Sequence, residues 1–218
     1  MTMAVPDDSR EKKLERGLTT NRIESLSDGV FAIVLTLMVF QIRVPDIPAA
    51  QAAHDLWPRL MHQAPEFYSY AVSFILVGIY WVGHHNMYHL VKRSTRPLLW
   101  MNLLFLMFVG FVPYTVALVG RYADIRRVMI IYGVHLMIIS GLMFLQWWYV
   151  TRKKNLLVSP LSPEFIRSVD FKILTAPAVC VLAIFTSFIS VRGSYLLYLL
   201  TIVMYLLPTH MDKYWTEM

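Results

Sequence analysis

Apolar residues gather along this chain in long blocks that are separated by short polar and charged joints. A helix needs about 20 apolar residues to cross a hydrocarbon core of roughly 30 Å. The pattern therefore predicts an all-α integral membrane protein. Its six transmembrane helices are expected at residues 23–44, 66–90, 97–120, 128–150, 171–191 and 194–211. Between the last two lie only Val191, Arg192, Gly193 and Ser194, so a tight helical hairpin is expected there.

Polar segments flank and interrupt the apolar blocks. Residues 1–22 are expected to form a cytoplasmic N-terminal segment, residues 23–211 one six-helix transmembrane domain, and residues 212–218 a cytoplasmic tail. The N-terminal segment lacks the apolar core of a signal peptide, so the first helix should be retained. The segment 45–65 is too polar to span, and Trp57, Leu60 and Met61 indicate that it rests at the membrane interface.

Composition and charge agree with the pattern. The chain is 57% hydrophobic and 16% charged, whereas soluble domains carry about 25% charged residues. The net charge of +6 requires no nucleic-acid partner, because 14 of the 20 Lys and Arg residues fall on the N-terminal side of the predicted helices. The positive-inside rule then places both termini in the cytoplasm. A single cysteine, Cys180, excludes a disulfide framework.

The first predicted helix is unusual because its apolar part is short. At 1.5 Å per residue, the uninterrupted apolar stretch 30–42 covers only about 20 Å. The helix must therefore include Ser27 and Asp28, and a carboxylate at the membrane boundary is a candidate functional group. Glu24 has the same sign, and Arg22 lies too far around the helix to reach Asp28. The partners of Asp28 should come from another helix or another subunit.

A stripe of apolar side chains continues along the same helix. Ile33, Leu37 and Phe40 follow the spacing i, i+4, i+7, with Thr36 beside them and Gly29 one turn before. Such a stripe is either a helix-packing surface or, where several copies surround an axis, the wall of a pore. Apolar rings can gate a pore by dewetting, and rings of oxygens can replace the hydration of an ion.

The residues at the start of this helix resemble a known family signature. Arg22-x-x-x-Leu26-Ser27-Asp28, followed by GVFAIVLTLMVFQIRVP, is similar to the R-x-x-x-F-S-D motif of prokaryotic TMEM175-like potassium channels. Leu26 stands where the family usually has Phe, which should alter packing there. Further features similar to that family are Trp81-x-x-His84-His85 in the second helix, and Asn102 and Pro113-Tyr114 in the third.

The resemblance implies a homotetramer in which the first helix of each subunit lines a central pore for potassium ions. Ile33 would form a hydrophobic constriction, Leu37 and Phe40 would continue the apolar lining, and Thr36 would contribute to a selectivity layer. The implied partners are lipids and the permeating K+, and neither an organic cofactor nor a metal site is expected. The implied location is a bacterial or archaeal cytoplasmic membrane.

In the same family a polar network holds the pore helix to its neighbours. Carried over by position, Arg22, Ser27 and Asp28 belong to this network, and we expect their partners to be Trp81, His84, His85 and Asn102. Asp28 would then fix the helix rather than bind the ions.

The residues also bear on three other functions. His85 and His89 share the i, i+4 spacing of a metal pair, but the chain holds no second histidine box. No G-x-S-x-G turn supports a hydrolase, so an enzyme is not expected. A proton- or cation-coupled secondary transporter that uses Asp28 stays open as the alternative, although no inverted repeat is visible.

Overall fold

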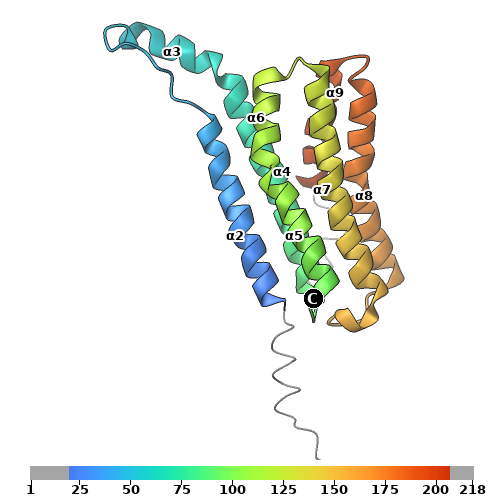
Figure 1. Cartoon of the computed structure of the whole chain (residues 1–218). Coiled ribbons are helices and arrows are strands. Elements are labelled where there is room, and N and C mark those ends of the chain that lie inside the picture. The colour runs from blue at the N-terminus through green and yellow to red at the C-terminus, as the bar shows by residue number, and fades with distance from the viewer. Residues whose placement is uncertain (1–19, 207–218) are drawn as a thin grey trace, which may run out of the picture.

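The computed structural model describes residues 20–206, which form long helices packed side by side (Figure 1). The predicted segment 1–22 lies mostly outside these residues, and the predicted tail 212–218 lies wholly outside them. Apart from an isolated bridge between Val91 and Leu157, the described part of the chain contains no β-structure. The expected all-α architecture is confirmed. The helices are α2 (Asn21–Leu37), η1 (Met38–Gln41), α3 (Ala52–His62), α4 (Ala64–His89), α5 (Arg96–Gly110), α6 (Val112–Tyr122), α7 (Arg126–Arg152), η2 (Lys154–Leu156), α8 (Pro163–Thr186) and α9 (Val191–Leu206).

Five helical stretches within residues 20–206 are long and apolar enough to cross a membrane. They are Asn21–Gln41, Ala64–His89, Arg96–Tyr122, Arg126–Arg152 and Pro163–Thr186. The sixth predicted helix corresponds to α9, a shorter apolar helix of 16 residues that covers about 24 Å. The end of the predicted stretch 194–211 lies outside the described residues.

The predicted hairpin between the last two helices exists, but its position in the sequence was wrong. α8 ends at Thr186 and α9 already begins at Val191, so the expected turn at residues 191–194 is the first turn of α9. Ser190 explains the shift, because its hydroxyl accepts a hydrogen bond from the Gly193 backbone N–H at 3.1 Å and so caps the helix. The true turn spans residues 187–190.

α8 also begins earlier in the sequence than the predicted helix 171–191. The helix begins at Pro163 and not near residue 171, because the Ser162 hydroxyl accepts a hydrogen bond from the Phe165 backbone N–H at 3.2 Å. Proline in the first turn is favourable, since its missing N–H would have no helical partner there. The added turns carry Glu164, Arg167 and Asp170, so hydropathy alone does not include them.

The third predicted helix is broken near its middle. α5 ends at Gly110 and α6 begins at Val112, next to Pro113. Proline lacks the N–H that would continue the backbone ladder, so Pro113 donates no backbone hydrogen bond to a carbonyl of α5. The third predicted span thus consists of two helices joined at Phe111. By contrast, α8 runs through Pro177 without a break.

α3 extends outward from one end of the bundle, on the side of α2, and lies between η1 and α4 in the chain (Figure 1). Leu56, Trp57 and Met61 are exposed, and Leu60 is half-buried. An apolar side left open on a short helix fits a position in the plane of the membrane surface, which was the expectation for residues 45–65.

Candidate pore helix and its contacts

α2 has one buried side and one exposed side. The buried side consists of Ile23, Ser27, Phe31, Val34 and Met38, all at most 3% exposed. These residues recur every three or four positions and pack against α4 and α5. The spacing fixes which side of the helix faces the subunit core.

The predicted pore-lining residues lie on the other side of α2. Ile33 is 58% exposed, Leu37 49% and Phe40 76%, and Thr36 is exposed as well. Leu26, at the unusual position of the motif, is 48% exposed, so it lies outside the subunit core. An apolar side exposed on a spanning helix must meet lipid, another subunit or a shared pore.

The Thr36 hydroxyl is already engaged as a donor. It approaches the Ala32 carbonyl oxygen at 2.9 Å and the Ile33 carbonyl oxygen at 3.0 Å. Because the single hydroxyl proton is directed back to the helix, the lone pairs of the oxygen stay available on the exposed side. The side chain is therefore oriented as an acceptor, which is the orientation that a cation requires.

Ser27, Asn102 and His84 form a chain of hydrogen bonds that joins three helices. The Ser27 hydroxyl donates to the Ile23 carbonyl oxygen at 2.8 Å and accepts from Asn102 Nδ2 at 3.1 Å. His84 Nε2 lies 2.8 Å from Asn102 Oδ1. An amide oxygen only accepts, so the imidazole donates. All three side chains are at most 2% exposed. Their hydrogen bonds join α2 to α5, and α5 to α4.

Aromatic rings hold the His84 imidazole in place. It stacks on Phe105 with a centroid distance of 5.5 Å and on Tyr88 at 4.4 Å, and Phe31 of α2 tilts against it at 5.9 Å. The Tyr88 hydroxyl donates to Gln146 Oε1 at 2.9 Å, which links α4 to α7. The rotamer of His84 is thus fixed from several sides.

Asp28 finds a donor on the neighbouring helix α4. The Trp81 indole Nε1–H donates to Asp28 Oδ1 at 2.8 Å, and both side chains lie at the surface of the subunit. Trp81 also stacks on His85 with a centroid distance of 5.6 Å. His85 in turn stacks on His89 at 6.3 Å. Within residues 20–206 no three His, Cys, Asp or Glu side chains converge on a possible metal position.

Arg22 stands apart from the other residues predicted for the polar network. Within the described residues no hydrogen bond or ion pair involving its guanidinium is present. Arg22 precedes Leu26, Ile33 and Phe40 by 4, 11 and 18 residues, so it lies on the exposed side of the helix. The structure thus brings together Ser27, Asp28, Trp81, His84 and Asn102, with His85 joined by stacking.

A second polar contact, which the sequence does not predict, holds the other end of this helix. Gln41 Nε2 of η1 donates to the Pro113 carbonyl oxygen at the break between α5 and α6. His135 of α7 donates from Nε2 to the Phe108 carbonyl oxygen at 2.9 Å, and its Nδ1 lies 2.9 Å from Thr115 Oγ1. Both side chains thus donate to backbone carbonyls on the two sides of the break between α5 and α6. Pro113 was the available signal, but it does not identify its partners.

The comparisons with known proteins agree with this geometry. A family model described as "Endosomal/lysosomal potassium channel TMEM175" matches residues 22–113. A protein named as a potassium channel from Streptomyces collinus is 36% identical over 141 residues, covering 63% of this chain and 67% of that relative. Another from Chamaesiphon minutus is 30% identical and covers 79% of this chain and 86% of that relative. The chain belongs to the TMEM175 family.

Solved structures of the TMEM175 family share the fold. The crystal structure described as a lysosomal potassium-selective channel TMEM175 homolog from Chamaesiphon minutus matches with a TM-score of 0.72 and 28% identity, covering 85% of this chain and 95% of that chain. A variant of the potassium channel MtTMEM175 in complex with a nanobody–MBP fusion protein matches with a TM-score of 0.58 at 19% identity, covering 84% and 90%, which supports the fold alone.

Vertebrate members match over a smaller part of their length. The protein named endosomal/lysosomal proton channel TMEM175 from Bos taurus is 36% identical over 105 residues, which is 46% of this chain and 22% of that relative. As a member of this family of ion channels, the chain is a multi-pass membrane protein and not an enzyme, and it requires no cofactor. The family model ends at Pro113, so it includes the Ser27–Asn102–His84 chain but not His135.

Proposed function

We propose that four copies of this chain form a potassium-permeable cation channel, with the ions passing along an axis that four α2 helices surround. The observation that carries the proposal is the asymmetry of α2. One side is fixed to the subunit through Ser27 and Phe31, whereas Ile33, Leu37 and Phe40 on the other side are exposed. Names of the relatives and of the solved homolog support potassium as the ion.

The narrowest point of the proposed pore is a ring of four Ile33 side chains. A ring of branched apolar side chains in a narrow pore excludes water, and this dewetting opposes ion passage. Leu37 continues the apolar lining at the end of α2, and Phe40 extends it into η1. Thr36 presents its oxygen lone pairs between these layers, where they can replace part of the hydration of K+.

The polar contacts of α2 serve as anchors in this proposal. Ser27, Asn102 and His84, with Asp28 and Trp81 beside them, hold the first half of the helix so that Ile33 faces the axis. Arg22 lies on the exposed side of α2. If it belongs to the predicted polar network, its partner is on a neighbouring subunit.

The proposed orientation has six spans, with α9 as the sixth, and both termini in the cytoplasm of a bacterial or archaeal cell. The excess of Lys and Arg on the N-terminal side supports this orientation. In it, Arg22 and Asp28 lie toward the cytoplasmic end of the pore, and Phe40 lies toward the outer end.

The decisive experiment is electrical recording from the purified protein in liposomes under potassium and sodium gradients. Unitary currents that favour potassium are expected. Ile33→Ala should raise the basal current several-fold, because the smaller side chain widens and wets the constriction. The matched control is Ile138→Ala on α7, another exposed isoleucine on a spanning helix. Equal currents in both variants and in the original protein would place the gate elsewhere.

Selectivity is tested in the same recordings. Thr36→Ala should lower the potassium-to-sodium permeability ratio, because it removes an oxygen from the proposed ion path. Thr175→Ala is the matched control, since Thr175 on α8 is partly exposed and also donates to the carbonyl oxygen four residues earlier, at 2.8 Å. A permeability ratio that Thr36→Ala leaves unchanged would remove Thr36 from the selectivity layer.

A second candidate function is proton transport, because several vertebrate relatives are named proton channels. A pH-sensitive dye inside the same liposomes, with equal potassium on both sides, measures proton flux separately. Saturable, proton-coupled flux without unitary steps would favour the secondary transporter with Asp28 as the coupling site.

A further inference from the structure

Exposed cations gather at the end of the bundle where α7 ends. They are Lys92 after α4, Arg96 at the start of α5, Arg152 at the end of α7 and Lys153 directly after it, and together they form the basic cluster. Backbone hydrogen bonds hold the two loops of this cluster together. The Lys92 N–H donates to the Leu156 carbonyl oxygen at 2.7 Å, and the Val158 N–H donates to the Leu90 carbonyl oxygen at 3.0 Å.

Side chains also join the start of α5 to the end of α7. The Tyr149 hydroxyl oxygen lies 3.1 Å from Thr95 Oγ1 and accepts a hydrogen bond from Lys153 Nζ at 3.2 Å. Arg96 follows Thr95 directly, so it starts beside the same contact. The basic cluster is therefore assembled by defined contacts between separate segments.

The charge of the basic cluster is not compensated by neighbouring acids. Within the described residues no carboxylate forms a salt bridge with any of its four side chains. Between Glu66 and Glu164 the chain has one acidic residue, Asp124, which lies just before the opposite end of α7. Asp170 of the neighbouring helix α8 accepts a hydrogen bond from Trp147 Nε1 at 2.8 Å. Clusters of about 4–8 Lys and Arg beside a spanning helix bind anionic headgroups.

An exposed apolar stripe of α7 leads away from the basic cluster. It contains Val134, Gly141, Leu145 and Trp148, whose spacing of three, four or seven residues puts them on one side of the helix, and Arg152 continues it. The Arg152 guanidinium carbon lies 5.9 Å from the centroid of the Trp148 ring. Gly141, Leu145 and Trp148 also border an open hollow of about 590 Å³. This outer side of α7 is thus cationic at one end and apolar along the rest.

Aromatic side chains indicate the depth of the basic cluster in the membrane. Trp148 precedes Arg152 by four residues, and Trp100 follows Arg96 by four residues. Both indoles are exposed, and four residues of a helix cover about 6 Å. Exposed tryptophans are enriched at the membrane–water interface. The cations one turn beyond them therefore lie at the level of lipid headgroups.

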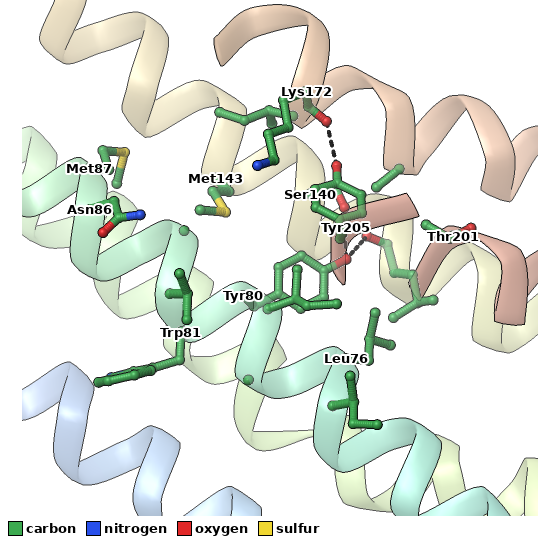
Figure 2. Close-up of a pocket in the computed structure, with 18 of the residues that line it drawn as sticks. Leu76, Tyr80, Trp81, Asn86, Met87, Ser140, Met143, Lys172, Thr201 and Tyr205 are labelled. Carbon is green, nitrogen blue, oxygen red and sulfur yellow. Dashed lines mark hydrogen bonds between the residues drawn. The ribbon is translucent and has the colours of Figure 1, made fainter. Parts of the chain in front are cut away.

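The inner side of α7 differs from this outer side. A cavity of about 710 Å³ lies there among α4, α7, α8 and α9, with Trp81 at its border (Figure 2). The Tyr80 hydroxyl lies 2.8 Å from Ser140 Oγ, and the Tyr205 hydroxyl donates to the Lys172 carbonyl oxygen. These hydroxyls are satisfied within the subunit, so the inner cavity serves only as a comparison for the outer side.

We propose that the outer side of α7 binds an anionic phospholipid, with its phosphate at the basic cluster and one acyl chain along Trp148, Leu145 and Gly141. A phospholipid matches both the positive charge and the apolar stripe. A soluble phosphate compound would leave the stripe without a partner, and a second copy of this chain would leave the basic cluster without an anion. In the proposed orientation the lipid belongs to the cytoplasmic leaflet. The choice of leaflet rests on the proposed function, whereas the binding does not.

The binding is measured directly on the purified full-length protein. It is reconstituted with equal amounts of phosphatidylglycerol and phosphatidylcholine, transferred to mild detergent, and analysed by native mass spectrometry for lipid that stays bound. Preferential retention of phosphatidylglycerol is expected. Retention of no lipid, or of both lipids equally, would overturn the proposal.

The headgroup contact is tested by charge. Arg152→Gln should reduce the preference for phosphatidylglycerol over phosphatidylcholine by about fivefold, because it removes one cation next to the phosphate. Arg126→Gln is the matched control, since Arg126 is exposed at the other end of α7 and its guanidinium carbon lies 4.9 Å from the Phe188 ring centroid. Equal reductions in both variants would show that any cation at the end of a span suffices, and would overturn the proposal.

The acyl-chain contact is tested by polarity. Leu145→Gln should lower the retained amount of both lipids several-fold, because the chain loses apolar contact. Leu174→Gln is the matched control, since Leu174 on α8 is 45% exposed and Leu145 is 42% exposed. Gly78→Phe projects into the inner cavity, where a Cβ would meet no atom within 4 Å, and should leave retention unchanged. A loss in Gly78→Phe but not in Leu145→Gln would move the lipid to the inner cavity and overturn the proposal.

Two further outcomes would replace the phospholipid by another occupant. Displacement of the lipid by an excess of inorganic phosphate would assign the basic cluster to a soluble phosphate compound. A change in oligomer mass without loss of lipid in Leu145→Gln would assign the stripe to contact between subunits. Channel recordings separate this proposal from the proposed function. Selective lipid retention without current contradicts the channel alone, and current without selective retention contradicts the lipid site alone.

Discussion

The two ends of the proposed pore helix are held by contacts of different kinds. Near its start, α2 is joined through buried side chains, Ser27 to Asn102 and Asn102 to His84. At its far end, η1 is joined by one side-chain amide, Gln41, to a backbone carbonyl of Pro113. The first contact is fully buried and the second is partly buried. The first end is therefore fixed by several mutually dependent groups, and the second by a contact that can be exchanged at low cost.

The difference follows from what each contact satisfies. At the first end the polar atoms belong to side chains, and each needs the others because no water reaches them. At the second end the acceptors are backbone carbonyls beside the break at Pro113, and His135 donates to the one at Phe108. We expect the Phe40 end of the helix to shift more easily than the Ser27 end.

The largest effect is expected from breaking the buried contact. Asn102→Leu removes the acceptor of His84 Nε2 and leaves a buried N–H without a partner, which costs about 1–3 kcal/mol in the free energy of unfolding. Unfolding is followed with a thiol-reactive dye, because the chain has one cysteine and Cys180 is buried at 1% exposure. Cys180 lies on α8, away from the mutated contact.

A double-mutant cycle tests whether this contact acts as a unit. Ser27→Ala and Asn102→Leu should be non-additive by about 0.5–3 kcal/mol, because the two side chains share one hydrogen bond. Additive effects would show that Ser27 and Asn102 stabilise the subunit independently. The first end of α2 would then not be fixed by mutually dependent groups.

The sequence was sufficient to predict the first end but not the second. Blocks of apolar residues revealed most of the helices, and the spacing of Ile33, Leu37 and Phe40 placed them on one side of the first helix, because helical periodicity depends on local sequence alone. That this side is exposed and not packed within the subunit is visible only in the structure. The partners of Ser27 could be expected from the family motif. Nothing in the sequence indicates that Gln41 would meet a backbone carbonyl 72 positions away.

Other differences between prediction and structure have the same origin. The start of α8 and the turn before α9 depend on the hydroxyl caps of Ser162 and Ser190, which add or remove a turn without changing the hydropathy. The cavity beside Trp81 depends on how four helices pack, and this packing cannot be obtained from the pattern of any one of them.

A smaller loss of stability is expected at the second end. Gln41→Leu removes one neutral, partly buried hydrogen bond, worth about 0.5–1.5 kcal/mol. The dye assay should show this loss to be additive with that of Asn102→Leu, because residues 27 and 41 are about 21 Å apart along the helix. In recordings, Gln41→Leu should also change the open probability of the channel, because Gln41 holds the segment that carries Phe40. Gln51→Leu, at an exposed position before α3, is the control, and equal recordings from both variants would show that η1 is not the adjustable end.

The smallest effect on subunit stability is expected at Asp28. Trp81→Phe keeps an aromatic ring beside His85 but removes the indole donor to a surface carboxylate, so the dye assay should show a loss below about 1 kcal/mol. Asp28→Asn should cost less still, because its amide oxygen can accept the same bond. If this contact positions α2 in the assembled channel, both variants should reduce the tetramer fraction in size-exclusion chromatography, or the open time, and leave the potassium-to-sodium ratio unchanged. Intact tetramers with normal conductance and a shifted ratio would instead place Asp28 in the ion path and remove it from the anchors at the Ser27 end.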